Sequence, residues 1–98
     1  MKRRVIWSKT ALNQFAKAIE FIREDSPQNA DSVKERILAA VATLENTTVE
    51  HRKDPYRLSN DGSFYYFELL KYRISYRLTE NTVLIVRLRH TSIKPKNY

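Results

Sequence analysis

The sequence contains no cysteine, one glycine, three prolines and two histidines among 98 residues. The lack of cysteine excludes disulfides, thiol catalysis and cysteine-ligated metal sites. The two histidines, His51 and His90, do not form the closely spaced pairs of common zinc motifs. We therefore expect no metal and no cofactor. The scarcity of glycine and proline also argues against fibrous or low-complexity architecture.

Long hydrophobic runs are missing as well, since no apolar stretch approaches the roughly 20 residues that a membrane helix needs. Lys2, Arg3 and Arg4 are typical of the start of a signal peptide, but only residues 5–7 follow before polar residues return. Hydrophobic residues make up 42% of the chain and charged residues 30%, a balance typical of folded domains. We expect one domain over residues 1–98, cytoplasmic and without membrane contact.

The charge is abundant and unevenly distributed. Eighteen lysines and arginines stand against 11 acidic residues, which gives a net charge of +7. Residues 1–9 carry a net +4, residues 10–50 a net −3 and residues 51–98 a net +6. Solubility, the alternative explanation, does not require such sorting. The second half therefore predicts binding to a polyanion such as nucleic acid, the ribosome or an acidic protein segment.

Two amphipathic helices are predicted in the first half, after a short strand over residues 3–7. Ser8 is typical of a helix N-cap, and Ser26 and Pro27 end one helix and begin the next. So short a connection predicts an antiparallel helical hairpin. Apolar residues recur about 3.6 positions apart: Ala11, Leu12, Phe15, Ala18, Ile19 and Ile22 on the first helix, and Ala30, Val33, Ile37, Val41 and Leu44 on the second.

The pattern changes to strand-like alternation in the second half. Residues 64–70, 72–78 and 83–89 are predicted strands, and residues 56–59 a further short one. Asn60-Asp61-Gly62 predicts a turn, with the only glycine at its tightest point. The predicted fold class is therefore α+β in the order β-α-α-β-β-β, with the helical hairpin on one face of a curved, mostly antiparallel sheet.

Alternation within the strands predicts two different sheet faces. The face packed on the helices would carry Tyr72, Ile74, Tyr76, Leu78, Leu84, Val86 and Leu88. The uncovered face would gather Arg73, Arg77, Arg87 and Arg89. Guanidinium groups so close together repel unless anions lie between them, and their geometry matches phosphate oxygens. This face therefore predicts phosphate binding, with an ion-pair ladder to Glu68 as the alternative.

With this order of elements, the chain resembles the RelE/ParE superfamily of toxins from bacterial type II toxin–antitoxin pairs. The resemblance covers essentially the whole chain. It rests on the combination of Val5-Ile6-Trp7-Ser8, Ser26-Pro27-x-x-Ala30, Tyr72-Arg73-Ile74-Ser75-Tyr76, Arg87-Leu88-Arg89-His90 and a tail ending in Tyr98.

The resemblance implies two possible activities and one shared partner. RelE-like members cleave mRNA in the ribosomal A site, with the RNA's own 2′-hydroxyl as nucleophile, whereas ParE-like members poison DNA gyrase by protein contact. A cognate antitoxin is implied in both cases. Our first expectation is a metal-independent endoribonuclease that acts on ribosome and mRNA and arrests translation. Gyrase inhibition is the alternative.

The nuclease expectation assigns a role to each candidate residue. By resemblance, Arg73 would hold the scissile phosphate, with support from Arg89, and Tyr98 would stack on a base or take part in proton transfer. His90 is the near-neutral acid or base next to these arginines. Contacts to other phosphates would come from Arg77, Arg87, Lys94 and Lys96.

Structural alternatives accompany these roles. His90 could simply form a hydrogen bond at the end of a strand, and Tyr98 could be a disordered chain end. Residues 51–53 could be solvated surface instead of a second RNA contact, and Tyr65, Tyr66 and Tyr72 sheet packing instead of base platforms. Two departures from the nuclease pattern are visible. Phe64 and Tyr66, followed by Glu68, stand where RelE-type nucleases can present lysines, and Thr91 stands where many have an arginine. A basic nucleic-acid-binding module without toxicity is a third class of function.

Overall fold

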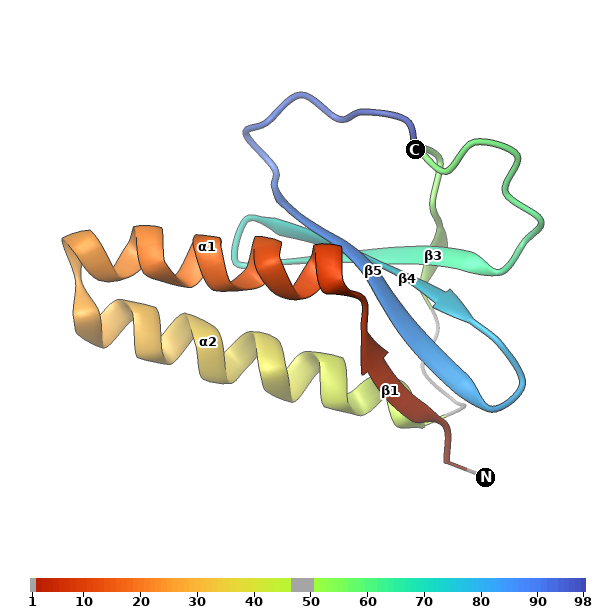
Figure 1. Ribbon diagram of the computed structural model, residues 1–98, viewed down its shortest axis with the longest axis horizontal. Helices are drawn as coiled ribbons and strands as arrows, with labels where there is room; N and C mark the ends of the chain where they lie inside the picture. Colours follow the sequence, from red (N-terminus) through yellow and green to blue (C-terminus); the bar gives the residue numbers. More distant parts are fainter. Residues whose placement is uncertain (1, 47–50) are drawn as a thin grey trace.

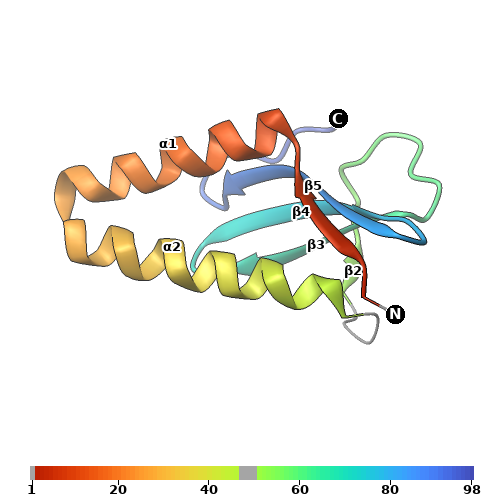
Figure 2. The same ribbon diagram turned by 60° about the horizontal axis from the view of Figure 1, so that its bottom comes forward.

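The computed structural model describes residues 2–46 and 51–98 and has two layers. Figures 1 and 2 show a helical hairpin against one face of a curved five-stranded sheet. Among the described residues, no helix has the length and apolar character to cross a membrane. The elements in chain order are β1 (Arg4–Trp7), α1 (Lys9–Asp25), α2 (Pro27–Ala42), the 3-10 helix η1 (Thr43–Glu45), β2 (Arg52–Lys53), β3 (Phe64–Leu69), β4 (Tyr72–Leu78) and β5 (Thr82–His90).

Both predicted helix starts are confirmed. The side chain of Ser8 accepts a hydrogen bond from the backbone N–H of Ala11 at 3.1 Å, and Ser26 accepts one from Asn29 at 3.2 Å. Pro27 occupies the first helical position of α2, where its missing N–H costs nothing. The caps thus fix the hairpin connection where the sequence placed it.

The apolar stripes of the helices form half of the core, with one exception. Ala11, Phe15 and Ile19 on α1 are buried, whereas Leu12 is 52% exposed. The prediction for Leu12 is wrong because it lies about 100° around the helix from Ala11, at the edge of a stripe narrower than expected. The α2 stripe is confirmed, since Ala30, Val33, Ile37, Val41 and, in η1, Leu44 are all buried.

The sheet has the strand order β1-β5-β4-β3-β2. Only β1 and β5 are parallel, so the prediction of a mostly antiparallel sheet is confirmed. The strand predicted at residues 56–59 is wrong. Its place in the sheet is taken by β2, which pairs with Tyr65 and Tyr66. Residues 55–59 form turns instead, because the side chain of Asp54 accepts a hydrogen bond from the backbone N–H of Tyr56 at 2.9 Å.

A β-bulge in β5 changes which residues face the helices. Ser75 pairs with Arg87, but the next residue on β4, Tyr76, pairs with Ile85, so Val86 is an extra residue. One extra residue reverses the alternation. Ile85 is fully buried in the core, as is Val83, whereas Leu84 lies opposite Arg77 on the other face. The predictions that Leu84 and Val86 pack on the helices are therefore wrong. The prediction that Leu88 is buried in the core is confirmed.

Candidate functional site

Four arginines project from the sheet face that the helices leave uncovered, and we call Arg73, Arg77, Arg87 and Arg89 the arginine face. Arg73 and Arg89 are direct cross-strand partners, and Arg87 lies opposite Ser75. Arg77 lies four residues beyond Arg73 on β4, which keeps it on the same side. The prediction that these side chains share one face of the sheet is confirmed. The bulge at Val86 does not separate Arg87 from Arg89, because both arginines follow it in β5.

Aromatic rings contact three of these guanidinium groups, those of Arg73, Arg87 and, over Phe64, Arg77. The guanidinium carbon of Arg73 lies 4.6 Å from the ring centroid of Tyr56 and 4.2 Å from that of Tyr66. Arg87 lies 4.0 Å from the ring centroid of Tyr98. Such cation–π contacts stabilise a charge most where water is excluded. Arg73 has a side-chain exposure of 16%, and Arg87 is 7% exposed as a residue.

Carboxylates neutralise only part of the arginine face. Glu68 lies directly opposite Arg73 on β3, at 3.7 Å, and Asp61 lies 3.5 Å from Arg77. Within residues 2–46 and 51–98, no carboxylate comes within 4.0 Å of Arg87 or Arg89. The ion-pair ladder therefore accounts for two of the four arginines and leaves an excess of positive charge.

The tail, residues 91–98, returns across this face and ends beside the segment that follows β2 (Figure 1). The backbone N–H of Tyr98 donates to the carbonyl of Tyr56 at 2.9 Å, and its carbonyl accepts from Leu58 at 2.7 Å. Arg87 donates through Nη1 to the carbonyl of Lys96 at 2.8 Å. Tyr98 is thus held by backbone and side chain, in contrast to the alternative of a disordered chain end.

The phenol of Tyr98 is committed to a buried carboxylate. Its Oη donates to Oδ2 of Asp54 at 2.5 Å, and Asp54 is 2% exposed. Burial, together with this hydrogen bond, raises the pKa of Tyr98 to about 12. The phenol therefore keeps its proton at neutral pH and is not free for proton transfer in this arrangement.

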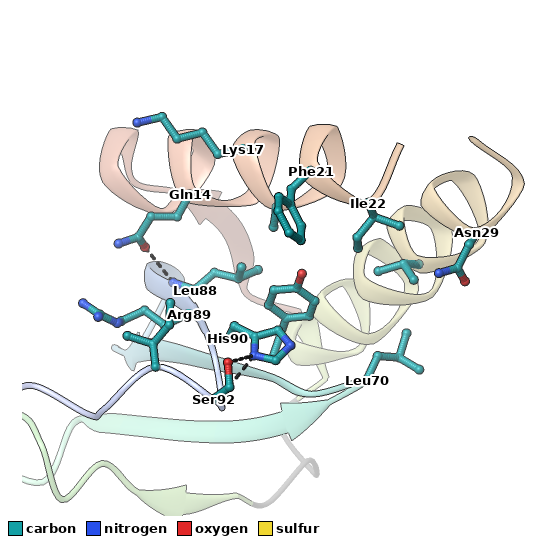
Figure 3. Close-up of a pocket in the computed structure, with 14 residues that line it drawn as sticks. Gln14, Lys17, Phe21, Ile22, Asn29, Leu70, Leu88, Arg89, His90 and Ser92 are labelled. Carbon is teal, nitrogen blue, oxygen red and sulfur yellow. Dashed lines mark hydrogen bonds between the residues drawn. The ribbon is translucent and has the colours of Figure 1, made fainter. Parts of the chain in front are cut away.

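His90 lies on the opposite side of the sheet from the arginine face. It pairs with the core residue Tyr72, and the two rings meet edge to face at 5.1 Å between centroids. Its Nδ1 accepts a 3.0 Å hydrogen bond from the backbone N–H of Ser92 and lies 2.7 Å from that residue's hydroxyl. Figure 3 shows Arg89, the preceding residue, extending away from the His90 ring. The structure therefore does not bring His90 together with Arg73 and Tyr98.

His90 instead lines a cavity of about 660 Å³ between the helices and the ends of β4 and β5 (Figure 3). The walls are largely apolar and include the exposed side chains of Phe21 and Ile93. The other histidine, His51, lies 2.7 Å through Nδ1 from the hydroxyl of the core residue Tyr76, and burial lowers its pKa. Arg89 also lines the His90 cavity, but neither imidazole reaches Arg73 or Tyr98.

The other residues predicted to contact phosphates lie at the edge of the arginine face. Three further residues, which the sequence analysis did not identify, lie beside the four arginines. Lys94 and Lys96 are exposed on the tail, and Arg77 is 45% exposed through its side chain. The sequence analysis missed Asp54, Tyr56 and Arg57, because residues in turns have no regular period from which the direction of a side chain can be predicted. In the part of the chain that the structure describes, no group of three histidine, cysteine or acidic side chains could hold a metal ion.

Comparison with known proteins gives a family and a fold. A family model described as the ParE toxin of the type II toxin–antitoxin system parDE matches residues 5–95. Among solved structures, the chain is similar to one from a chromosomal ParDE toxin–antitoxin system of P. aeruginosa. The TM-score is 0.70 at 14% identity, with 91% of this chain and 96% of that chain covered. At this identity the match supports the fold alone.

A second similar structure is that of a YoeB dimer from Staphylococcus aureus. It has a TM-score of 0.49 and 13% identity, and the match covers 92% of this chain and 98% of that chain. No curated protein matches the sequence.

Proposed function

The chain belongs to the ParE toxin family of type II toxin–antitoxin systems, within the RelE/ParE superfamily, and we propose that it arrests growth by inhibiting DNA gyrase through protein contact. This proposal reverses the order of the two activities expected from the sequence. Family membership implies a cognate antitoxin as its partner. Gyrase as the target and a non-enzymatic mode of action are the parts that we propose.

The position of His90 carries the proposal. Metal-free RNA cleavage requires proton removal, charge stabilisation and leaving-group protonation around one phosphate. Arg73 and Arg89 lie on one face of the sheet and His90 on the other, with its Nδ1 engaged by Ser92. Tyr98, the other candidate for proton transfer, is engaged as a hydrogen-bond donor to Asp54 and keeps its proton. An inhibitor that acts by surface contact needs none of these groups to meet.

Pulse-labelling of DNA and protein synthesis after controlled expression of the toxin tests the proposal. We expect DNA synthesis to fall first, with DNA damage signalling and intact mRNA, and co-expression of the antitoxin to restore growth. Purified toxin should inhibit supercoiling by gyrase and trap cleaved DNA–gyrase complexes. Early loss of protein synthesis with cleaved transcripts and unaffected gyrase would overturn it. Absence of any growth arrest would favour the basic nucleic-acid-binding module.

A ribosome-dependent endoribonuclease is the second candidate, and the arginine face favours it. Arg73, Arg87 and Arg89 lie close together with few carboxylate partners, which suits an RNA phosphate. Under this activity Arg73 would hold the scissile phosphate, and Arg77, Lys94 and Lys96 would contact flanking phosphates. Arg73→Ala would then abolish mRNA cleavage while the protein still folds and binds its antitoxin.

A further inference from the structure

In the described residues, four guanidinium nitrogens are buried without a hydrogen-bond partner. They are Nε of Arg57, Nη1 of Arg73, Nη2 of Arg87 and Nε of Arg89. A buried donor without an acceptor is costly, and most native structures avoid it. Four such donors on one surface therefore point to an acceptor that the chain itself does not supply.

Two relationships bring these donors together. Arg73 and Arg89 are cross-strand partners. Arg57 and Arg87 both lie over the ring of Tyr98, at 5.3 and 4.0 Å from its centroid. The tail covers Arg87, which is 7% exposed and donates to the carbonyl of Lys96.

The carboxylates nearby are already engaged or distant, and the buried hydroxyl of Ser75, opposite Arg87, carries no charge and is itself without a hydrogen-bond partner. Asp54 accepts from the Tyr98 hydroxyl and from the backbone N–H of Tyr56. Glu68 lies 3.7 Å from Nη2 of Arg73, beyond the usual hydrogen-bond distance, and its side chain is 51% exposed. Burial lowers the pKa of Arg87, and the neighbouring Arg89 and Arg73 act in the same direction, whereas Tyr98 and Asp54 raise it. A negative charge placed among these groups would remove both the repulsion and the unpaired donors.

We propose that residues 94–98 are a displaceable strap over a binding site for a phosphate-class oxyanion, formed by Arg57, Arg73, Arg87 and Arg89. In the closed state, Tyr98 makes two backbone hydrogen bonds and one to Asp54, and the donors stay unpaired. In the open state, the oxyanion accepts from the guanidinium groups, which match it in geometry and charge. The ligand biases the strap because it binds only one of the two states.

This inference does not rest on gyrase inhibition or on RNA cleavage, because it concerns a binding equilibrium of the chain alone. The shared ligand chemistry is a phosphate group, either free or within a nucleic acid. Both sources present the same oxygen geometry to the arginines, so separate arms of one experiment distinguish them.

The test is a titration of the full chain with inorganic phosphate, followed by NMR, against chloride at equal ionic strength. The arginine Nε–H signals report the site, and the backbone amide of Leu58, which donates to Tyr98, reports the strap. In the wild type we expect both sets of signals to shift together. If the strap is open about one tenth of the time, Tyr98→Ala should tighten phosphate binding about tenfold.

Two control variants test whether the tighter phosphate binding depends on the proposed site. Arg87→Lys in the Tyr98→Ala background keeps the charge but removes the planar fork, and it should cancel the gain. Arg23→Lys, at an arginine paired with Asp31 on the helical hairpin, should change nothing. If Tyr98→Ala fails to fold, Tyr98→Phe removes only the hydroxyl bond and should give a smaller gain in the same direction.

A dinucleotide that competes with phosphate would identify the source as a nucleic-acid phosphodiester, and phosphate binding without such competition would identify a free anion. Either result supports the site. The proposal is overturned if Tyr98→Ala binds phosphate no better than the wild type, or if its gain survives Arg87→Lys. It is also overturned if phosphate binds while the Leu58 amide stays unchanged.

Discussion

The hydroxyl of Tyr98 donates a 2.5 Å hydrogen bond to Asp54, a carboxylate 44 residues earlier that is 2% exposed. The same carboxylate accepts from the backbone N–H of Tyr56. One buried side chain therefore fixes both the turn after β2 and the end of the tail. The positions of Arg87 and Arg73 depend on it as well, since Tyr98 and Tyr56 contact these two arginines.

Replacement of this carboxylate should destabilise the protein. Asp54→Ala leaves the Tyr98 hydroxyl and the Tyr56 N–H without their acceptor, so we expect a loss of about 1–3 kcal/mol in the free energy of unfolding. Urea unfolding followed by Trp7 fluorescence measures it. Asp31→Asn, which breaks an exposed ion pair with Arg23, should change stability by less than about 0.5 kcal/mol. Equal losses in the two variants would contradict the role of Asp54.

The β-bulge makes opposite predictions for two neighbouring residues of β5. Ile85→Ala removes a fully buried side chain and should cost about 2–5 kcal/mol of unfolding free energy. Leu84→Ala, on the other face opposite Arg77, should cost about 1 kcal/mol. The same urea experiment measures both. The reverse order would mean that β5 follows the uninterrupted alternation of its sequence.

The raised pKa of Tyr98 predicts a stability change at high pH. The folded state holds the phenolic proton to about pH 12, whereas an unfolded tyrosine loses it near pH 10. This contribution to stability is therefore fully present below about pH 10 and is lost as the pH rises toward 12. We expect the melting temperature of the wild type to fall more steeply over that range than that of Tyr98→Phe.

Absorbance of the phenolate provides an independent check. Tyr76, whose pKa burial also raises to about 12, should titrate together with Tyr98 in the wild type. In Tyr98→Phe one of these late titrations should disappear. An unchanged number of late-titrating tyrosines would show that Tyr98 is exposed in solution.

Substitution of His90 separates the two proposed functions. If toxicity comes from contact with gyrase, His90→Ala should still arrest growth, because the imidazole contacts Tyr72 and Ser92 and takes no part in chemistry. Growth after induction, with antitoxin binding as the control for folding, measures this. Loss of toxicity in a variant that still binds its antitoxin would favour the nuclease.

The helical hairpin and the faces of β3 and β4 follow from local features of the sequence. Ser8, Ser26 and Pro27 set helix boundaries through caps that involve only neighbouring residues. The period of the apolar residues on α2 identifies its buried face without knowledge of the rest of the chain. Alternation likewise placed Arg73 and Arg77 on one face of β4 and Glu68 on the same face of β3.

The composition of the site depended on tertiary structure. The extra residue at Val86 is visible only once β5 is paired with β4, because a bulge is a property of two strands. Alternation alone places His90 on the opposite side of the sheet from Arg89, whereas its contact with Tyr72 depends on the pairing of β4 with β5. The positions of Asp54, Tyr56 and Tyr98 depend on contacts between a turn and a tail 40 or more residues apart. Local sequence thus determined the elements and their faces, whereas long-range hydrogen bonds and cross-strand register decided which side chains meet.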